Sequence, residues 1–317
     1  MSIPLLEVKN LTKYFNTQKG LLHAVENVSV TINKGETLGV VGESGCGKTT
    51  FGRTVIRLVE ATSGEVFLEG KDILALEGDN KKEIYRNIQM VFQDPYSSLN
   101  PRMSVGNIIE DPLVTMGHKM GKKELHQKIV ELMGIVGLPE RYYNTYPHEL
   151  DGGRRQRVGL ARALALDPKI VICDEPVSAL DVSIQAQILN LLMDLQEQKE
   201  LAYMFITHNL FVVKHISTHI AVMYMGQMVE YADKNELFSR PQHPYTKALF
   251  NAIPKPDLNF RGRKREILRG EVTSPVEPKP GCRFAPRCPH ASERCRQKDI
   301  ALKEISSGHL CACTLYE

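Results

Sequence analysis

The sequence lacks a long uninterrupted run of apolar residues. No window of its 317 residues approaches the roughly 18 continuous apolar residues that a membrane-spanning helix needs. The first ten residues, MSIPLLEVKN, also lack the basic start and apolar stretch of a secretory signal. We therefore expect a protein that is not exported, and that reaches any membrane from the cytoplasmic side, through partners.

The sequence also has little excess charge and no internal repeat. Its 40 basic and 37 acidic residues leave a net charge of +3, which is too small to indicate nucleic-acid binding. The one dense basic run, residues 261–269, we interpret as a solvated surface. With 42% hydrophobic and 24% charged residues, the composition is that of an ordinary globular protein. The length indicates one large domain with an appendage, or two domains.

Three stretches of the chain differ in their residue patterns. Residues 5–93 alternate as strands do around a continuous apolar strand at 36–42, and residues 94–165 form a mostly helical stretch interrupted by prolines. Further on, apolar strands at 169–176, 203–209 and 219–231 alternate with amphipathic helices at 183–198 and 210–217. This pattern predicts an α/β fold with a mostly parallel sheet covered on both faces, an antiparallel β-subdomain and an inserted helical subdomain.

A glycine-rich segment follows the strand at 36–42 and opens a helix. Residues 42–49 read GESGCGKT and match the phosphate-binding pattern G-x-x-x-x-G-K-[ST]. The glycines let backbone amides surround a phosphate, Lys48 neutralises phosphate oxygens, and Thr49 can ligate magnesium. We therefore predict a site for a magnesium nucleotide. Its residues here are Gly42, Ser44, Gly45, Cys46, Gly47, Lys48, Thr49 and Thr50.

Two adjacent acids end the apolar strand IVICDE. Asp174 is placed to orient water on magnesium, and Glu175 to polarise the water that attacks the nucleotide. Two carboxylates at a buried strand end are costly unless a cation is nearby, and a magnesium nucleotide supplies one. Two surface acids at a strand end are the alternative, which the following order Pro-Val-Ser-Ala-Leu-Asp disfavours.

With these motifs in this order, the chain resembles the ATP-binding cassette (ABC) proteins over residues 5–230. The resemblance implies a P-loop NTPase (RecA-like) fold that binds ATP and Mg²⁺. It assigns the adenine-stacking aromatic to Phe15, with its neighbour Tyr14 as the alternative. It assigns Gln93 to the glutamine that meets magnesium and water, and His208 to the histidine that contacts the γ-phosphate. Residues 178–181 match the loop that crosses to a partner cassette.

The loop that faces the partner's nucleotide in such proteins departs from the family pattern. Where the family reads L-S-G-G, this chain has Asp151 before Gly152 and Gly153. An aspartate caps a helix as well as serine does, but an ionised carboxylate cannot donate a hydrogen bond to a phosphate. Arg154 lies one turn on and could neutralise Asp151. We therefore expect a dimer of unlike cassettes, in which the site that uses Asp151 binds nucleotide and turns it over poorly.

The C-terminal part is more specific. Residues 91–113, 240–254 and the tail GCRFAPRCPHASERC…GHLCAC are similar to the ATPase subunits of bacterial oligopeptide and dipeptide importers, above all their F-type member. From its pattern alone, HPYTKALFNAI is a proline-started amphipathic helix. In relatives the tail holds a [4Fe–4S] cluster, which matches here to Cys282, Cys288, Cys295 and Cys313 and leaves Cys311 spare. Zinc fits the spacing less well, and unligated thiols are the third alternative.

The resemblance implies an ATPase that powers peptide uptake. We expect an ABC nucleotide-binding domain at 1–235, with the helical subdomain at about 94–165, and a cysteine-containing extension at 236–317. The implied partners are a second ABC ATPase subunit, two integral-membrane permease subunits and, indirectly, a substrate-binding protein, with no nucleic acid. The implied location is the cytoplasmic face of the membrane, as a peripheral subunit. Nickel or oligosaccharide cargo, or a non-transport regulatory role, remain alternatives.

Overall fold

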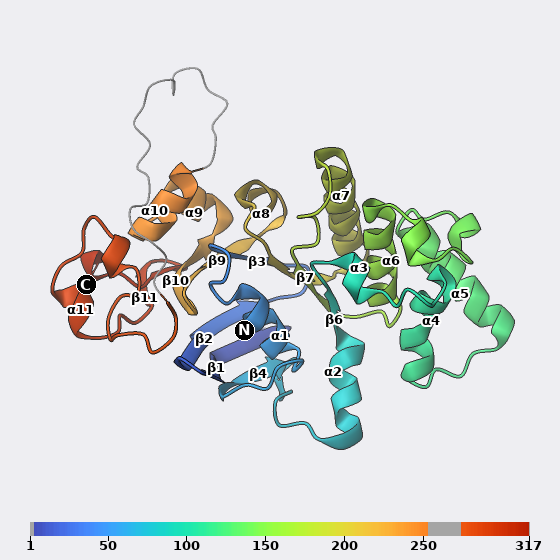
Figure 1. Cartoon of the computed structure of the whole chain (residues 1–317), viewed down its shortest axis with the longest axis horizontal. Helices are drawn as coiled ribbons and strands as arrows, with labels where there is room; N and C mark the ends of the chain where they lie inside the picture. The colour runs from blue at the N-terminus through green and yellow to red at the C-terminus, as the bar shows by residue number, and fades with distance from the viewer. Residues whose placement is uncertain (1–2, 253–273, 317) are drawn as a thin grey trace, which may run out of the picture.

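The computed structural model describes residues 3–252 and 274–316. The basic run at 261–269, expected to be a solvated surface, lies outside the described residues. Figure 1 shows a central sheet with a group of helices at one end and the C-terminal extension at the other. Among the described residues, no helix is long and apolar enough to span a membrane.

In the described part of the chain, the central sheet has eight strands in the order β11-β12-β10-β9-β3-β8-β7-β6. Its parallel part consists of β6 (Ile88–Val91), β7 (Ile170–Asp174), β8 (Ala202–Ile206), β3 (Thr37–Val41) and β9 (His219–Tyr224). Every residue of β3, β7 and β8 is buried, because both faces of a parallel sheet are covered. The predicted α/β fold is thus confirmed.

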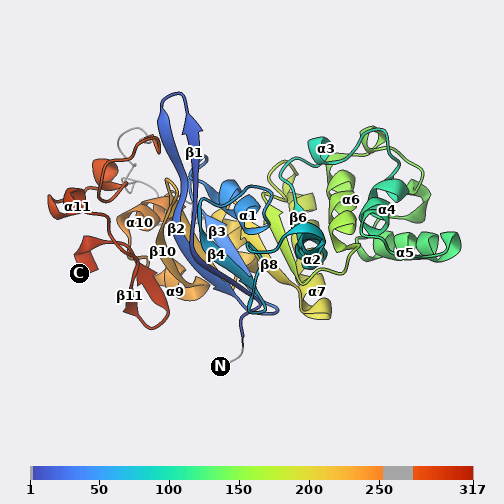
Figure 2. The same ribbon diagram turned by 90° about the horizontal axis from the view of Figure 1, so that it is seen from below.

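The two faces of this sheet pack against different elements. Val171, Cys173 and Phe205 pack with the helical subdomain, whereas Ile170, Ile172 and Met204 pack with the β-subdomain. Alternate residues of one strand point to opposite faces, so a single buried strand serves both cores. Figure 2 shows the antiparallel strands crossing in front of the central sheet.

The β-subdomain is a four-stranded sheet in the order β2-β1-β4-β5. Its strands are β1 (Leu6–Thr17), β2 (Gly20–Ile32), β4 (Ser63–Leu68) and the short β5 (Lys71–Asp72). All neighbouring pairs are antiparallel. The antiparallel β-subdomain expected from the alternating pattern is therefore present, and it contributes the β1–β2 ribbon that reaches the nucleotide loop.

The helical subdomain occupies the stretch that the prolines mark. It contains α3 (Pro95–Ser98), α4 (Val105–Thr115), α5 (Lys122–Ile135) and α6 (Gly152–Leu164), which lie together at one end of the molecule (Figure 1). Helices α1 (Lys48–Val55), α2 (Lys81–Asn87), α7 (Val182–Lys199), α8 (Leu210–Ile216) and α9 (Lys234–Ser239) complete the cassette. The chain thus inserts this helical unit between β6 and β7.

One expected strand is wrong. The apolar run at 219–231 forms two antiparallel strands, β9 and β10 (Gln227–Asp233), joined by a tight turn. Met225 and Gly226 at this turn have φ of 46° and 83°, as a two-residue hairpin turn requires. Continuous hydrophobicity hid the turn, because both strands are buried.

The C-terminal extension continues the central sheet. Strand β12 (His309–Cys311) pairs antiparallel with β10, and β11 (Lys303–Ser306) pairs with β12. The expected proline-started helix is present as α10 (Pro244–Asn251), and a short α11 spans Arg294–Gln297. The sheet therefore crosses the boundary that we predicted between residues 235 and 236.

A fully buried carboxylate joins the extension to the cassette. Glu230 of β10 accepts hydrogen bonds from the backbone N–H groups of Gln242 (2.6 Å) and His243 (3.0 Å). Its Oε1 also lies 2.8 Å from His309 Nε2 of β12. Both side chains of this pair are at most 1% exposed. Because buried charges must be paired, Glu230 fixes where the extension docks.

Candidate functional site

The glycine-rich loop connects β3 to α1, as the motif predicts. Lys48, the first residue of α1, is buried, and its Nζ donates to the carbonyls of Gly42 and Glu43, both at 2.9 Å. A Cβ on Gly47, at φ 102°, would lie 2.0 Å from the carbonyl oxygen of Ala24. Only glycine fits that close approach, so the loop wraps tightly on β2.

A hydroxyl and a carboxylate meet beside this loop. Thr49 Oγ1 donates to Asp174 Oδ1 at 2.8 Å. Burial raises the pKa of Asp174 above its ordinary value, while the Thr49 hydrogen bond opposes that rise. Among the residues that the structure describes, Asp174 Oδ2 is buried without a hydrogen-bond partner, although buried polar atoms are normally satisfied. Oxygen ligands and bound water suit Mg²⁺, so this orphaned oxygen and the hydroxyl fit a hydrated magnesium ion.

Glu175 is held between two of the predicted catalytic residues. Gln93 Nε2 donates to Glu175 Oε2 at 3.0 Å, and His208 Nδ1 lies 2.9 Å from Glu175 Oε1. The Glu175 side chain is 14% exposed and that of His208 is 59% exposed. Three segments far apart in the sequence therefore converge on one carboxylate at the ends of β6, β7 and β8.

A cavity of ≈ 230 Å³ extends from Thr49, Gln93 and Glu175 to the β-subdomain, and neither Asp174 nor His208 lines it. Phe15 lines it, whereas Tyr14 points away, with its hydroxyl donating to Glu26 at 2.8 Å. Of the two aromatics, the geometry thus favours Phe15 for contact with a base. The other predicted residues that line the cavity are Ser44, Gly45, Gly47, Lys48, Thr49, Thr50, Gln93 and Glu175.

Sequence reasoning missed part of this cavity wall. His23 and Ala24 of β2, Gly226 of the β9–β10 turn and Pro275 of the extension also line it. The turn glycine was the one available signal, because M-G inside an apolar run marks a bend. Nothing in the sequence indicates that Pro275, 67 residues after His208 of the last cassette motif, reaches the cavity.

The Asp151 loop lies apart from this cavity. Asp151 caps α6 by accepting a hydrogen bond from the Arg154 N–H at 2.8 Å, and it forms an ion pair with the Arg154 guanidinium. A Cβ on Gly153 would lie 2.8 Å from the Ile184 side chain, so close packing on α7 explains this glycine. None of residues 151–153 lines the nucleotide cavity of the same chain.

Four cysteines of the extension share a second, small cavity. Cys282, Cys288, Cys295 and Cys313 all line it, and Cys311 does not. The cavity measures ≈ 10 Å³, about the room that one water molecule takes. Within the described residues, no group of three or more His, Cys, Asp or Glu side chains is arranged to hold a single metal ion. Cys46 and Cys173 are buried in the cores around the nucleotide loop.

The strand, loop and helix at residues 37–55 form a P-loop, and Asp174 and Glu175 lie at the end of β7, two strands away in the sheet. Together they define a P-loop ATPase of the ATP-binding cassette class. The family model for ABC transporters matches residues 25–178, and that for the oligopeptide/dipeptide transporter C-terminal region matches residues 229–295. The chain belongs to the ABC transporter ATP-binding proteins of the oligopeptide and dipeptide transport group, as the motifs predicted. It is therefore an ATPase.

The relatives cover almost the whole chain. It is 48% identical to the oligopeptide transport ATP-binding protein AppF of Bacillus subtilis, over 98% of this chain and 97% of AppF. It is 46% identical to the dipeptide transport ATP-binding protein DppF of Haemophilus influenzae, over 98% and 96%. The ATP-binding cassette MJ0796, solved as a dimer bound to ADP and Pi, superposes with a TM-score of 0.67 at 30% identity. That match covers 72% of this chain and 98% of MJ0796.

Proposed function

We propose that this chain is the ATP-hydrolysing subunit that powers uptake of dipeptides or oligopeptides through an ABC importer at the cytoplasmic face of the membrane. The observation that carries the proposal is the Gln93–Glu175–His208 arrangement beside the lysine loop. The peptide cargo is supported by the relatives and by the C-terminal region. Nickel or oligosaccharide cargo, and a regulatory role, are the alternatives.

The chain's own residues divide the chemistry of ATP hydrolysis. Lys48 and the loop amides bind the phosphates, and Phe15 stacks on the adenine. Thr49 and Gln93, with Asp174 acting through a water, would hold magnesium, which would supply positive charge against the phosphate oxygens. Glu175 orients and polarises the attacking water, and His208 contacts the γ-phosphate. Since Gln93 and His208 both hold Glu175, a shift of either residue moves the base.

The partner cassette is a distinct subunit in this proposal. At about 4 Å and an effective dielectric near 20, one unit of like charge costs about 4 kcal/mol, which opposes closure of Asp151 over a triphosphate. The Arg154 ion pair softens this penalty without restoring a donor, and its two side chains are about half exposed. This chain's P-loop thus pairs with an intact serine loop of the partner to form the active site, and the opposite site turns over poorly.

The proposal is tested by isolating the chain with its partners. We expect it to co-purify with two multi-span membrane subunits and a second ATPase subunit. ATP turnover of the reconstituted complex should rise when substrate-binding protein and peptide are both present. If nickel or an oligosaccharide stimulated turnover and peptide did not, the cargo would be that compound and not a peptide. Isolation without any membrane subunit would refute the transport role.

The four thiols around the second cavity are proposed to hold a [4Fe–4S] cluster. Four thiolates are the ligand set of such clusters, and the four cysteines predicted from the tail line one cavity. The cavity is smaller than a cluster, so the thiols must move outward to take one up. A cluster there would stabilise the extension and take no part in ATP hydrolysis.

A cysteine exchange separates the two candidates for the fourth ligand. Cys313→Ser should abolish bound iron and sulfide in complex purified without oxygen, because it removes a thiol that lines the cavity. Cys311→Ser is the matched control and should retain both, since Cys311 does not line the cavity. Iron and sulfide content and visible absorption are measured. Zinc in the unsubstituted protein, or the same loss in both variants, would contradict the assignment.

A further inference from the structure

The extension contacts the nucleotide cavity directly. Leu22 of β2 forms an isolated antiparallel bridge with Val276, and the His23 N–H donates to the carbonyl of Pro275 at 3.0 Å. Pro275 itself lines the cavity together with His23. A segment that follows the cassette in the sequence thus contributes Pro275 to the wall of the nucleotide site.

Two arginines of the extension reach further into the cassette. Arg283 and Arg287 stand between Cys282 and Cys288, and each side chain is only 6% exposed. Burying an arginine is costly unless its charge is paired. Each of them has a carboxylate partner in the cassette, and each partner lies beside the nucleotide cavity.

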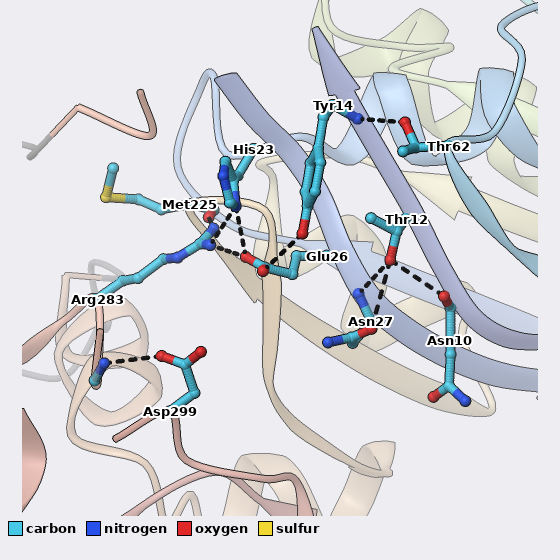
Figure 3. Close-up of polar contacts among 11 residues, drawn as sticks. Asn10, Thr12, Tyr14, His23, Glu26, Asn27, Thr62, Met225, Arg283 and Asp299 are labelled. Carbon is cyan, nitrogen blue, oxygen red and sulfur yellow. Dashed lines mark hydrogen bonds and ion pairs between the residues drawn. The ribbon is translucent and has the colours of Figure 1, made fainter. Parts of the chain in front are cut away.

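Arg283 supports the end of the cavity near Phe15. Its guanidinium pairs with Glu26 of β2 and donates to the carbonyl of Met225, the residue before the cavity-lining Gly226. Glu26 in turn lies 3.2 Å from His23 Nδ1, which lines the cavity. Figure 3 shows the Arg283 side chain reaching from the C-terminal extension to Glu26, His23 and Met225.

Tyr14 contacts Glu26 and His23 from the side opposite Arg283. The Tyr14 hydroxyl donates to the second oxygen of Glu26 at 2.8 Å, and the rings of Tyr14 and His23 lie 4.1 Å apart. Both carboxylate oxygens of Glu26 are therefore occupied. Removing Arg283 would leave Glu26 largely buried with its charge uncompensated, and His23 would lose its fixed neighbour.

Arg287 supports the phosphate end. It binds Glu43 with both nitrogens of its fork, Nη1 to Oε2 at 2.8 Å and Nη2 to Oε1 at 3.1 Å. Such two-point pairs are strong and fix orientation. Glu43 is the second residue of the glycine-rich loop, and its N–H donates to the hydroxyl of the buried Tyr245 at 2.8 Å. Its carbonyl accepts from Lys48 at 2.9 Å.

We propose that Arg283 and Arg287 are positioning residues of the ATP site, which hold the base end and the phosphate end of the cavity in their binding shape. Neither arginine lines the cavity, so each acts through its carboxylate partner. The C-terminal extension is then a working part of the nucleotide site.

Exchanges at the base end and at the phosphate end of the cavity are expected to weaken binding of different ligands. In the full-length chain, Arg283→Met should weaken MgATP binding about tenfold and leave binding of magnesium tripolyphosphate, which has no base, unchanged. Arg287→Met should weaken the binding of both ligands about tenfold, because Glu43 of the glycine-rich loop loses its two-point ion pair. Arg283→Lys and Arg287→Lys should recover part of the affinity, since lysine restores the charge without the fork.

The exposed Arg296 of the same extension provides the control. Arg296→Met should bind both ligands as the unsubstituted chain does, and thermal denaturation of every variant shows whether it folds. In the assembled complex, the two arginine exchanges should raise KM for ATP more than they lower kcat. Unchanged affinity in both variants would overturn the proposal. The proposal would also be overturned if both variants lost affinity equally for both ligands, had a lowered Tm, and recovered no affinity with lysine.

Discussion

Glu175→Gln is expected to lower ATP turnover by the assembled complex by about 10² to 10⁴-fold, the usual contribution of a positioned general base. Glutamine keeps the shape of the side chain and can accept the hydrogen bond that Gln93 donates, but it cannot polarise water as a carboxylate does. Binding of MgATP should persist, because Lys48 and the glycine-rich loop are untouched. The measurements are ATP turnover and equilibrium binding of the nucleotide.

The same exchange tests which site is active. In the proposed unlike dimer, Glu175→Gln stops the site completed by the partner's serine loop, whereas the equivalent exchange in the partner stops only the site that uses Asp151. The second exchange should therefore cost little turnover. The exposed Glu197 of α7 gives a control, since Glu197→Gln removes one carboxylate that does not line the cavity. If only the partner's exchange stops turnover, the assignment of the two sites is reversed.

Glu230→Ala is expected to destabilise the protein by about 3–5 kcal/mol, because it removes the acceptor of the buried His309 side chain, the buried His243 N–H and the partly buried Gln242 N–H. In a protein of this size, such a loss lowers Tm by about 10 °C. The extension should also become the first part cut by a protease, since β12 loses its anchor on β10. Thermal denaturation and timed proteolysis measure the two effects.

The neighbouring Glu236 supplies a matched control. Its Oε1 lies 3.8 Å from Nδ1 of the same histidine, but its side chain is 38% exposed. Glu236→Ala should therefore cost no more than about 1 kcal/mol, as exposed ion pairs usually do. Equal losses of stability in the two variants would show that Glu230 is not the anchor of the extension.

The nucleotide loop could be predicted because its chemistry is local. The order strand, glycines, lysine, threonine and helix fixes the backbone path and the side chains within residues 42–50, and the structure has these elements there. The pairing of Glu175 with Gln93 and His208 is not local. It depends on β6, β7 and β8 ending at the same edge of the sheet. The resemblance to ABC proteins assigned Gln93 and His208 to the site, but their contacts with Glu175 come from the structure.

Other features were hidden because hydrophobicity does not distinguish them. The β9–β10 turn lies within an apolar run, and its bend is set by the positive φ of Met225 and Gly226. The contacts of Arg283 and Arg287 could not be predicted from the sequence either, because both residues are charged and not apolar. In the sequence they stand among cysteines and prolines, and an arginine there is usually solvated.

The sequence by itself determined the class of this protein and its nucleotide loop, because both depend on residue types at short, fixed spacings. Only the tertiary structure decided that Phe15 rather than Tyr14 lines the nucleotide cavity, that Pro275 of the extension lines it too, and that the four matched cysteines line one common cavity. The physical reason is that these outcomes depend on which faces of distant strands and loops meet. Packing of the whole chain fixes those meetings, and no short segment carries them.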